Sequence, residues 1–452
     1  MRSSTTHRGL RLSRTPRKHM PPVALAGVAA ATLFLSACGI GGGDDDSADT
    51  TDTDAGDQEE ADLSGEITFQ TWNLQGGYED YFNDLVADFE EQHPDTTIDW
   101  IDQPAEGYQD KLSADAAAGT LPDVIDIGPE AAYTLASADM LLDLSQADPE
   151  AEQQYLPKSW EAMTFAGLGN GTYGYPWYLN TGPSFFNTEL FDECGLDSDS
   201  LPETFDELFD QAATMAESCS DTPMIGRMPA IETFGMYGVE LMNEEGTEFT
   251  FNNEAGVQLV EDYKELYEAG GLTEDSLNEQ QTGELEGFKA GHLGWLPGSS
   301  YTLQDLRETA PDVYENVAMG PLIANAAPNM YIQSIAVNSQ SENQDLAIEF
   351  ARFVTNADNQ LAFSQEAAIF PSADGSLDDP YFTEEEDSDD SRVRVEAAQQ
   401  VGEAEVYWPP AFSSQSADFL REQIALAIQG DKSPQQALDE SVDYANERLD
   451  SE

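Results

Sequence analysis

Residues 175–187 (YPWYLNTGPSFFN) gather side chains that suit the recognition of a small polar molecule. Five of these thirteen residues are aromatic, and two asparagines and two prolines lie among them. Aromatic rings stack on apolar faces, whereas amides exchange hydrogen bonds with hydroxyl groups. A pair of buried strands would have the same composition, so the segment by itself leaves a binding site and a packed core as alternatives.

Common catalytic motifs are missing from the sequence, which has no nucleophile elbow, phosphate-binding loop or HExxH motif. Residues 169–174 (GNGTYG) have the spelling of a dinucleotide-binding loop, but they lead into Tyr-Pro-Trp instead of a helix and predict a turn. No Cys/His cluster has the spacing of a zinc site, and neither His93 nor His292 has a recognisable catalytic partner. We therefore expect a binding protein without catalytic residues, metal or cofactor.

Two other functional classes remain as alternatives. A secreted glycoside hydrolase needs a pair of carboxyl groups, but a chain with 88 acidic residues offers many pairs and singles out none. A structural or adhesive lipoprotein would bind no small molecule. Substrate turnover would indicate the first class, and the lack of any small-molecule ligand the second.

Charge excludes one class of partner. The chain has 18 basic and 88 acidic residues, a formal net charge of −70. Six of the basic residues lie in the first 37 positions, so residues 38–452 keep 12 basic and 88 acidic residues and a net charge of −76. Nucleic-acid phosphates require lysine and arginine, which excludes a nucleic-acid partner. We hypothesise a high-salt habitat, where salt screens the repulsion; a melting temperature that does not rise from low to molar salt would favour the alternative, an acidic surface that serves solubility alone.

The first 37 residues have the features of an export signal. A basic stretch ends at Lys18, and an apolar stretch follows over residues 23–35, which is short for a membrane span. It ends in Leu35-Ser36-Ala37-Cys38, which is similar to the bacterial lipobox. The similarity implies cleavage before Cys38 and attachment of lipid, such as palmitate, to Cys38. An ordinary signal peptide followed by a chance cysteine is the alternative.

Residues 38–63 predict an acidic, disordered tether, because their Asp, Glu, Thr, Ser, Gly and Ala side chains cannot bury enough apolar surface to fold. The protein would then lie outside the cytoplasm, lipid-anchored to the outer face of the cell membrane. Cys194 and Cys219 remain in this oxidising compartment, where they flank one expected helix. We predict a disulfide between them; two free, partly buried thiols are the alternative.

The remaining chain, residues 64–452, is long enough for two domains. Apolar patterning predicts three strands that alternate with three helices, which is typical of an α/β fold with a mostly parallel sheet and helices on both faces. Farther along, we expect a glycine-rich turn region at residues 287–301 and an acidic, mobile insertion at residues 374–391. The alternating elements lie at residues 66–72, 78–89, 97–101, 108–118, 124–128 and 130–138, and later ones at 205–216, 257–269, 331–338, 345–356, 416–429 and 434–449.

Six segments resemble, in order, the sugar-binding group of extracellular solute-binding proteins of bacterial ABC importers, the group that includes maltose-binding protein. Two segments depart from the family pattern: Phe205 stands where tryptophan is usual, and His292 stands where lysine is usual, with the tryptophan displaced to Trp295. The segments lie at residues 67–72 (ITFQTW), 119–125 (GTLPDVI), 173–176 with 185–191 (YGYP, FFNTELF), 201–208 (LPETFDEL), 288–299 (FKAGHLGWLPGS) and 430–438 (GDKSPQQAL).

The resemblance implies a fold like the type II periplasmic binding proteins, with two lobes joined by a three-crossing hinge and a ligand cleft between them. Lobe 1 would comprise residues 64–176 and 323–372, and lobe 2 residues 181–319 and 378–452. The implied function is capture of a mono- to oligosaccharide outside the membrane and its delivery, by a monomer, to the ABC permease subunits. A non-sugar solute is an alternative ligand.

The resemblance also directs attention to thirteen candidate ligand-binding residues, because a neutral sugar needs rings for its CH faces and amides or carboxylates for its hydroxyls. Structural alternatives stay open for four of them: a core aromatic for Trp72, a capped helix end for Asp126, lid packing for Trp295 and a rigid Trp-Pro-Pro linker for Trp408. The candidates are Trp72, Asn73, Gln75, Asp126, Trp177, Tyr178, Asn180, Trp295, Gly298, Ser299, Tyr331, Trp408 and Phe412.

Overall fold

A computed structural model of the chain describes residues 63–219, 222–277 and 283–449. The predicted export signal, the predicted lipidation site Cys38 and all but the last residue of the predicted tether lie outside these ranges. None of the helices within them combines the length and apolar character needed to cross a membrane.

A six-stranded sheet, with strand order β11-β6-β10-β3-β1-β2, forms the centre of one of the two regions of the structure. β1 pairs in parallel with β2 and β3, but β10 is antiparallel to β3 and β6, and β11 is antiparallel to β6. The expected mostly parallel sheet is therefore wrong beyond β3, because β10 and β11 return from later parts of the chain and enter in the opposite direction. The strands are β1 (Gly65–Trp72), β2 (Thr96–Gln103), β3 (Val124–Ile127), β6 (Tyr175–Asn180), β10 (Tyr331–Val337) and β11 (Phe370–Pro371).

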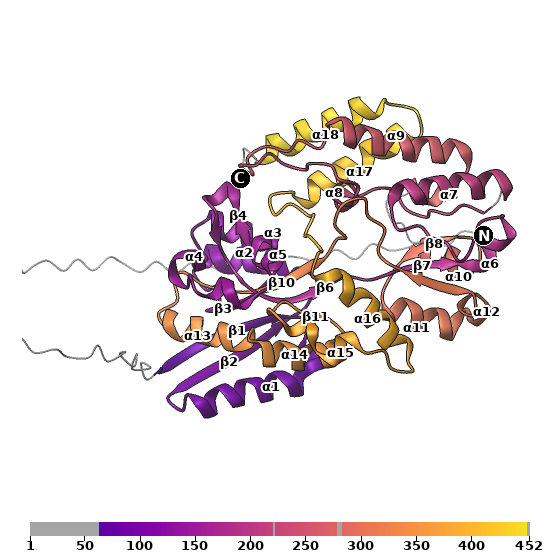
Figure 1. Cartoon of the computed structure of the whole chain (residues 1–452). Coiled ribbons are helices and arrows are strands. Elements are labelled where there is room, and N and C mark those ends of the chain that lie inside the picture. Colours follow the sequence, from indigo (N-terminus) through magenta and orange to yellow (C-terminus); the bar gives the residue numbers. More distant parts are fainter. Residues whose placement is uncertain (1–62, 220–221, 278–282, 450–452) are drawn as a thin grey trace, which may run out of the picture. The chain divides into compact units, whose positions relative to one another are not determined.

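Helices cover both faces of this sheet, as Figure 1 shows. On one face, α1 (Gln75–Gln92), α13 (Gln344–Val354) and α14 (Ala357–Ala367) enclose a cluster that we call the α1-side core. On the other, α2 (Tyr108–Ala118) and α3 (Pro129–Ser137) enclose the α2-side core. Alternate residues of β10 enter opposite cores, because successive strand side chains point to opposite faces: Ile335 and Val337 join the first, and Ile332 and Ala336 join the second.

The neighbouring strand β6 contains a bulge, which interrupts its own alternation of side chains between the two faces. Gln333 pairs with Tyr178, whereas the next residue, Ser334, pairs with Pro176, so Trp177 is the extra residue on its strand. A bulge re-aims the side chain at the extra position. Trp177 is fully buried in the α1-side core as a result.

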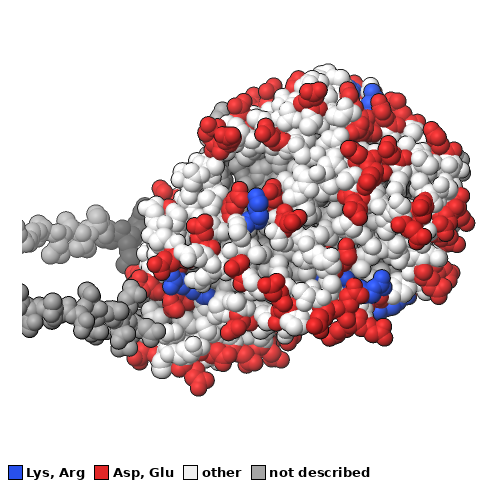
Figure 2. Space-filling model, in the orientation of Figure 1, with Lys and Arg blue, Asp and Glu red and all other residues white. Residues whose placement is uncertain are grey.

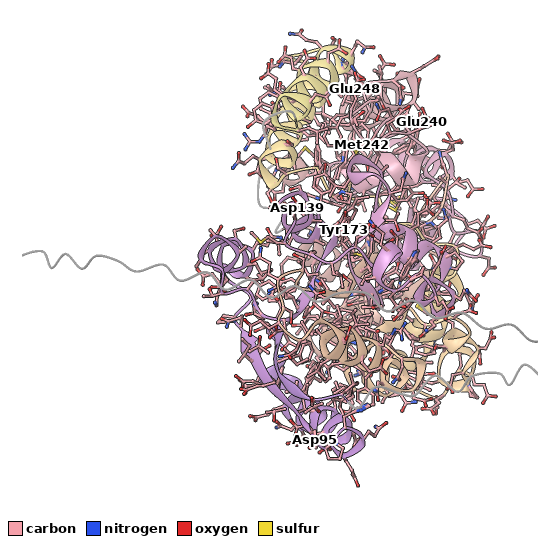
Figure 3. The ribbon with its side chains drawn as sticks, turned by 90° about the vertical axis from the view of Figure 1, so that its left-hand side faces the viewer. Asp95, Asp139, Tyr173, Glu240, Met242 and Glu248 are labelled. Atoms are coloured by element: carbon pink, nitrogen blue, oxygen red, sulfur yellow. A yellow bond between two sulfur atoms is a disulfide. The ribbon has the colours of Figure 1, made fainter. Side chains whose placement is uncertain are left out.

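A second, three-stranded antiparallel sheet has the order β8-β7-β9, with β7 (Ser184–Asn187), β8 (Trp295–Pro297) and β9 (Val317–Gly320). Beside it, the helical core is built by α7 (Phe205–Ser218), α8 (Ile231–Tyr237), α9 (Glu254–Ala269), α17 (Ser414–Ile428) and α18 (Pro434–Leu449). Figure 1 shows α9, α17 and α18 packed side by side. In Figure 3, Met242 marks the edge of the helical core and Tyr173 the edge of the α2-side core.

Two segments are more regular than expected. The predicted turn region at residues 287–301 contains β8 and the start of α11 (Ser300–Thr309), and the predicted mobile insertion contains α15 (Pro380–Thr383) and the start of α16 (Asp389–Val401). The other short elements are α4 (Leu144–Ala147), α5 (Pro157–Ala162), β4 (Thr164–Phe165), β5 (Gly171–Thr172), α6 (Thr188–Glu193), α10 (Gly283–Lys289), α12 (Pro311–Tyr314) and four 3-10 turns, Ala151–Gln154, Ala166–Leu168, Glu274–Leu277 and Ser376–Asp378.

The chain passes between the two sheets where β6 leads to β7 and where β9 leads to β10. At the first passage the backbone is crowded: a Cβ added to Gly182 would lie 1.9 Å from the Gly298 carbonyl oxygen, so only glycine fits. The expected lobe division stays a prediction. Ile323 belongs to the helical core, and α16 packs on both regions, because Ala397 and Val401 join the α2-side core whereas Val393 joins a cluster that includes Phe185 and Leu303.

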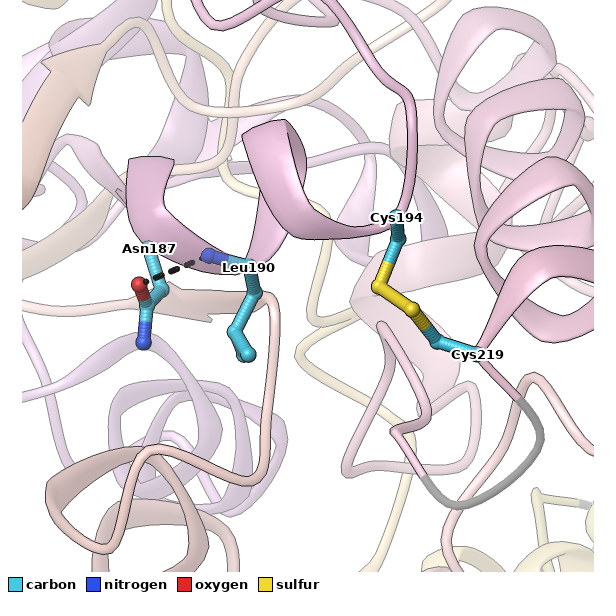
Figure 4. The surroundings of a disulfide bond; sticks show 4 residues. All are labelled: Asn187, Leu190, Cys194 and Cys219. Carbon is cyan, nitrogen blue, oxygen red and sulfur yellow. Dashed lines mark hydrogen bonds between the residues drawn. A yellow bond between two sulfur atoms is a disulfide. The ribbon is translucent and has the colours of Figure 1, made fainter.

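A disulfide joins Cys194, which follows α6, to Cys219, which follows α7 (Figure 4). The Cα atoms are 5.6 Å apart, and 25 residues separate the two cysteines. Closing a loop of that length removes entropy from the unfolded chain and stabilises the fold by about 3 kcal/mol. The bond joins the end of α6 to the end of α7, and Cys194 lies within the helical core.

Candidate functional site

Two cavities, of about 640 and 300 Å³, share Glu232 and Tyr331 in their linings, and we call them the wide and narrow halves of one cleft. The wide half is also lined by Trp72, Tyr108 and Trp408. The narrow half is lined by residues that include Asn180, Arg227, Trp295 and Ser299. Both volumes are typical of sites for small molecules.

Strand and helix ends position the rings of the wide half. Trp72 is the last residue of β1 and Tyr108 the first of α2, and their rings stack with centroids 5.8 Å apart and planes 17° apart. Ligands of α/β folds commonly lie at such strand ends. The Trp72 ring Nε1–H is buried and has no hydrogen-bond partner among the described residues.

Asp126 forms hydrogen bonds with both residues of this ring pair. Its Oδ2 accepts a hydrogen bond from the Trp72 backbone N–H at 3.1 Å, and its carbonyl oxygen accepts one from the Tyr108 hydroxyl at 2.6 Å. Burial raises the pKa of Asp126 to about 8, although the bond from Trp72 favours the charged form. Asp126 is fully buried and lines neither half of the cleft. In this structure it positions Trp72, and its direct contact with ligand stays a prediction.

The narrow half is built around Trp295, which opens β8 and is 3% exposed. Its ring N–H is buried and finds no partner within residues 63–449 as described. The Arg227 guanidinium lies 5.9 Å from the ring centroid. Two short bonds, 2.7 and 2.5 Å, tie that guanidinium to the Glu284 carboxylate, which neutralises its charge.

Glu232, the second residue of α8, lies where the two halves meet. Its Oε1 accepts a hydrogen bond of 3.2 Å from the Tyr331 hydroxyl, while its Oε2 is buried without a partner in the described part of the chain. Burial raises the pKa of Glu232, and the nearby Arg227 charge partly opposes that effect. Tyr331 is 57% exposed, a large aromatic residue left open at the cleft.

Seven of the predicted residues line the cleft. Tyr331 belongs to both halves, Trp72 and Trp408 to the wide half, and Asn180, Trp295, Gly298 and Ser299 to the narrow half.

Six predicted residues do not line it, Asp126 among them. Trp177 stacks on Phe363 in the α1-side core at 5.2 Å, because the β6 bulge turns it inward. Phe412 is fully buried in the helical core.

The other three lie beside the cleft without lining either half. Asn73 follows Trp72 in a left-handed conformation with a φ of 56°. Gln75 starts α1 and is exposed. Tyr178 packs against the α1-side core.

Sequence reasoning missed four cleft-lining residues, Tyr108, Arg227, Glu232 and Gln333. Arg227 had a usable signal, because basic residues are rare in this chain, and Gln333 had another, since a glutamine interrupts an apolar strand. Glu232 had none, as one of 88 acidic residues. In the portion of the chain that the structure describes, no group of three or more His, Cys, Asp or Glu residues is arranged to hold a metal ion.

The cleft between two α/β regions defines a class of protein, and the chain belongs to it: residues 75–361 match the family of bacterial extracellular solute-binding proteins. It is 23% identical over 364 residues to the diacetylchitobiose binding protein DasA of Streptomyces coelicolor, covering 77% of this chain and 81% of that protein. It is 22% identical over 389 residues to the galactooligosaccharide-binding protein of Bacillus subtilis, covering 81% of this chain and 86% of that protein.

A solved structure shows the same fold. The crystal structure of a periplasmic-binding protein from Synechococcus sp. MITs9220 has a TM-score of 0.74 to this chain at 26% identity, covering 85% of this chain and 99% of that one. The chain therefore has the two-lobed α/β fold of the type II periplasmic binding proteins, as the six segments of the sequence implied.

Proposed function

We propose that this protein is the substrate-binding component of an ABC importer and that it binds a mono- to oligosaccharide in the cleft. One observation carries the proposal: four cleft-lining residues present buried polar atoms that have no hydrogen-bond partner among the residues the structure describes. Two are donors, Trp72 Nε1 and Trp295 Nε1, and two are acceptors, Glu232 Oε2 and Gln333 Oε1. An unpaired buried polar group costs about 1–3 kcal/mol, and a polyhydroxylated ligand can serve both donors and acceptors.

The aromatic side chains supply the second part of sugar recognition. Trp72, Tyr331 and Trp408 line the wide half, where ring faces suit the apolar CH faces of a sugar. Two relatives, named for diacetylchitobiose and galactooligosaccharide, support this ligand class. We propose that the contacts come from Trp72, Tyr108, Asn180, Glu232, Trp295, Gly298, Ser299, Tyr331, Gln333 and Trp408.

A ligand panel tests the ligand class. Thermal unfolding of the purified protein in about 2 M salt is followed with sugars, polyols, amino acids and peptides, because a ligand that binds only the folded state raises the midpoint. We expect a rise with one class of sugar and no new product in the mixture. Product formation would favour a glycoside hydrolase instead, and a rise with amino acids or peptides but no sugar would overturn the carbohydrate assignment.

We also propose that the protein is exported and anchored through lipid on Cys38, with residues 38–63 as the tether that lets a monomer deliver sugar to the permease. The proposal is supported by the lipobox-like Leu35–Cys38 sequence and by an extracellular family. Mass spectrometry of the N-terminal peptide from the exported protein tests it. An acylated Cys38 is expected, and an unmodified one would refute the anchor.

A further inference from the structure

The wide half of the cleft is lined by carboxylates without a basic residue. Asp110, Glu130 and Glu232 line it, and none of its lining residues is lysine or arginine. Asp110 and Glu130 lie in the first turns of α2 and α3, where their charges offset the positive helix ends that would otherwise attract anions. This half therefore favours a cation over an anion.

Acidic residues are common over the whole face in Figure 2, so their number alone says little about the cleft. The narrow half, however, includes Arg227 among its lining residues. Charge thus differs between two halves of one cleft. That difference needs an explanation beyond the general acidity of the chain.

The rings of the wide half are held in ways that suit a cation. The Trp408 Nε1–H donates to the Phe412 carbonyl oxygen at 3.0 Å, so Trp408 offers the ligand carbon surface and no ring donor. Trp72 is backed by the stacked Tyr108 ring. Tryptophan and tyrosine faces attract ammonium groups through the ring quadrupole, most strongly where water is excluded.

Among the described residues, Glu232 is the carboxylate of this half that has a buried oxygen without a hydrogen-bond partner. Tyr331 occupies its Oε1, and its Oε2 is buried and unpartnered among the residues that the structure covers. The nearby Arg227 is already neutralised by Glu284 through two hydrogen bonds. Gln333 Oε1 adds a second buried acceptor that has no partner among the described residues. An ammonium carries three donors and no acceptor, and so matches these two acceptors better than a hydroxyl does, while a hydroxyl of the same sugar can accept from the Trp72 Nε1–H.

We propose that the sugar carries a protonated amine and that Glu232 selects it, with the amine lying at Glu232 Oε2 beside the rings of the wide half. The ligand class is thus an amino sugar with a free amino group. This inference rests on the proposed sugar-binding function and names the ligand of the same cleft.

Matched ligands test the inference. Binding to the purified protein is measured by isothermal titration calorimetry for sugars that differ only in an amine, a hydroxyl or an acetamide: glucosamine, glucose and N-acetylglucosamine; galactosamine, galactose and N-acetylgalactosamine; and chitobiose, cellobiose and diacetylchitobiose. We expect the amine member of at least one set to bind about tenfold tighter than its neutral counterparts, because a charged hydrogen bond replaces a neutral one.

Two results would overturn the inference in different ways. If neutral members bind as well as or better than amines in every set, sugar binding stands and the amine assignment falls. If no sugar of any set binds, the amine assignment falls, and the ligand panel decides whether the proposed sugar-binding function stands.

A variant pair tests the role of Glu232. E232Q keeps the size and an acceptor oxygen but removes the charge, so the tenfold preference for the amine should disappear while neutral sugars lose less affinity. E268Q is the control, because Glu268 is exposed on α9 and gives the same change in net charge. An E232Q protein that keeps the amine preference would overturn the assignment to Glu232. If E232Q does not fold, the matched ligands on the unmodified protein still decide.

Discussion

The two halves of the cleft meet at Glu232 and Tyr331, yet they handle charge in opposite ways. In the narrow half, the Arg227 guanidinium already donates two hydrogen bonds to the Glu284 carboxylate. Where the narrow half meets the wide half, Glu232 keeps one buried oxygen without a partner in the described part of the chain. An ion pair closed within the protein costs desolvation and orients its surroundings, whereas an unpartnered group is available to a ligand. The ion pair of the narrow half thus orders the protein around it, whereas the unpartnered oxygen of Glu232 can distinguish one ligand from another.

Breaking the closed ion pair should have the largest effect. Glu284 is 8% exposed, and E284Q would leave the Arg227 charge without its partner. We expect a loss of about 3 kcal/mol of unfolding free energy, discounted for the partial exposure of Arg227, because a buried ion that loses its partner is destabilising. Urea unfolding measures it. E286Q, on the solvent-exposed side of the same helix, is the control and should change stability by less than about 0.5 kcal/mol; an E284Q midpoint equal to that of the control would contradict the prediction.

The next largest effect is expected on the pH dependence of stability, and it comes from Asp126, which positions Trp72 of the wide half. Its pKa is raised from 3.8 to about 8 in the fold, so between these values the native state holds a proton that the unfolded chain has lost. Stability from this group is therefore greatest below its ordinary pKa and falls as pH rises toward about 8, by at most about 1.4 kcal/mol per pH unit.

The D126N variant isolates that dependence. Asparagine stays neutral and can still accept the Trp72 N–H bond, so we expect its stability to fall about 2 kcal/mol less than that of the unmodified protein from pH 5 to pH 8. Denaturant unfolding at both pH values, in equal salt, gives the difference. Identical pH dependence in the two proteins would show that Asp126 is charged throughout.

Conservative ring substitutions should have the smallest effects and would sharpen the comparison. W72F and W295F each remove an unpartnered buried N–H from one half of the cleft. If a sugar spans both halves, each variant should weaken its binding about tenfold with little loss of stability. W160F, a substitution in the α1-side core away from the cleft, is the control for a general tryptophan effect. A loss confined to W72F would restrict the ligand to the wide half.

Much of the fold could be predicted from local patterns. The helix expected at residues 108–118 is Tyr108–Ala118 in the structure, and it ends at Gly119 in a left-handed conformation that glycine adopts easily. The helix expected at residues 434–449 begins at Pro434, a residue suited to a helix start. Such signals are written in neighbouring residues and need no knowledge of distant contacts.

The direction of strands and of single side chains could not be predicted in this way. β10 runs antiparallel to β3 because of where the chain returns, which no local pattern records. Trp177 turns into a core because its strand carries one residue more than its partner. Glu232 becomes a site residue because α8 places it opposite Tyr331, 99 positions along the chain. These are properties of long-range pairing.

One contact has a consequence for the time course of binding. Gly167 lies between Phe165 and Leu168, which belong to or pack against the α2-side core, and Gly246 follows Met242 in sequence; a Cβ added to Gly167 would lie 3.0 Å from the Gly246 carbonyl oxygen. The two backbones therefore approach closely, and the Tyr133 hydroxyl lies 3.2 Å from the same added Cβ. In a two-lobed binding protein, a methyl group here would push the two segments apart.

We expect G167A to shorten the residence time of a bound sugar in stopped-flow measurements. G402A is the control, because a Cβ added to Gly402 meets no atom within 4 Å. An unchanged dissociation rate in G167A would refute this. The pair of glycines would thus govern how long a ligand stays, independently of which ligand the cleft selects.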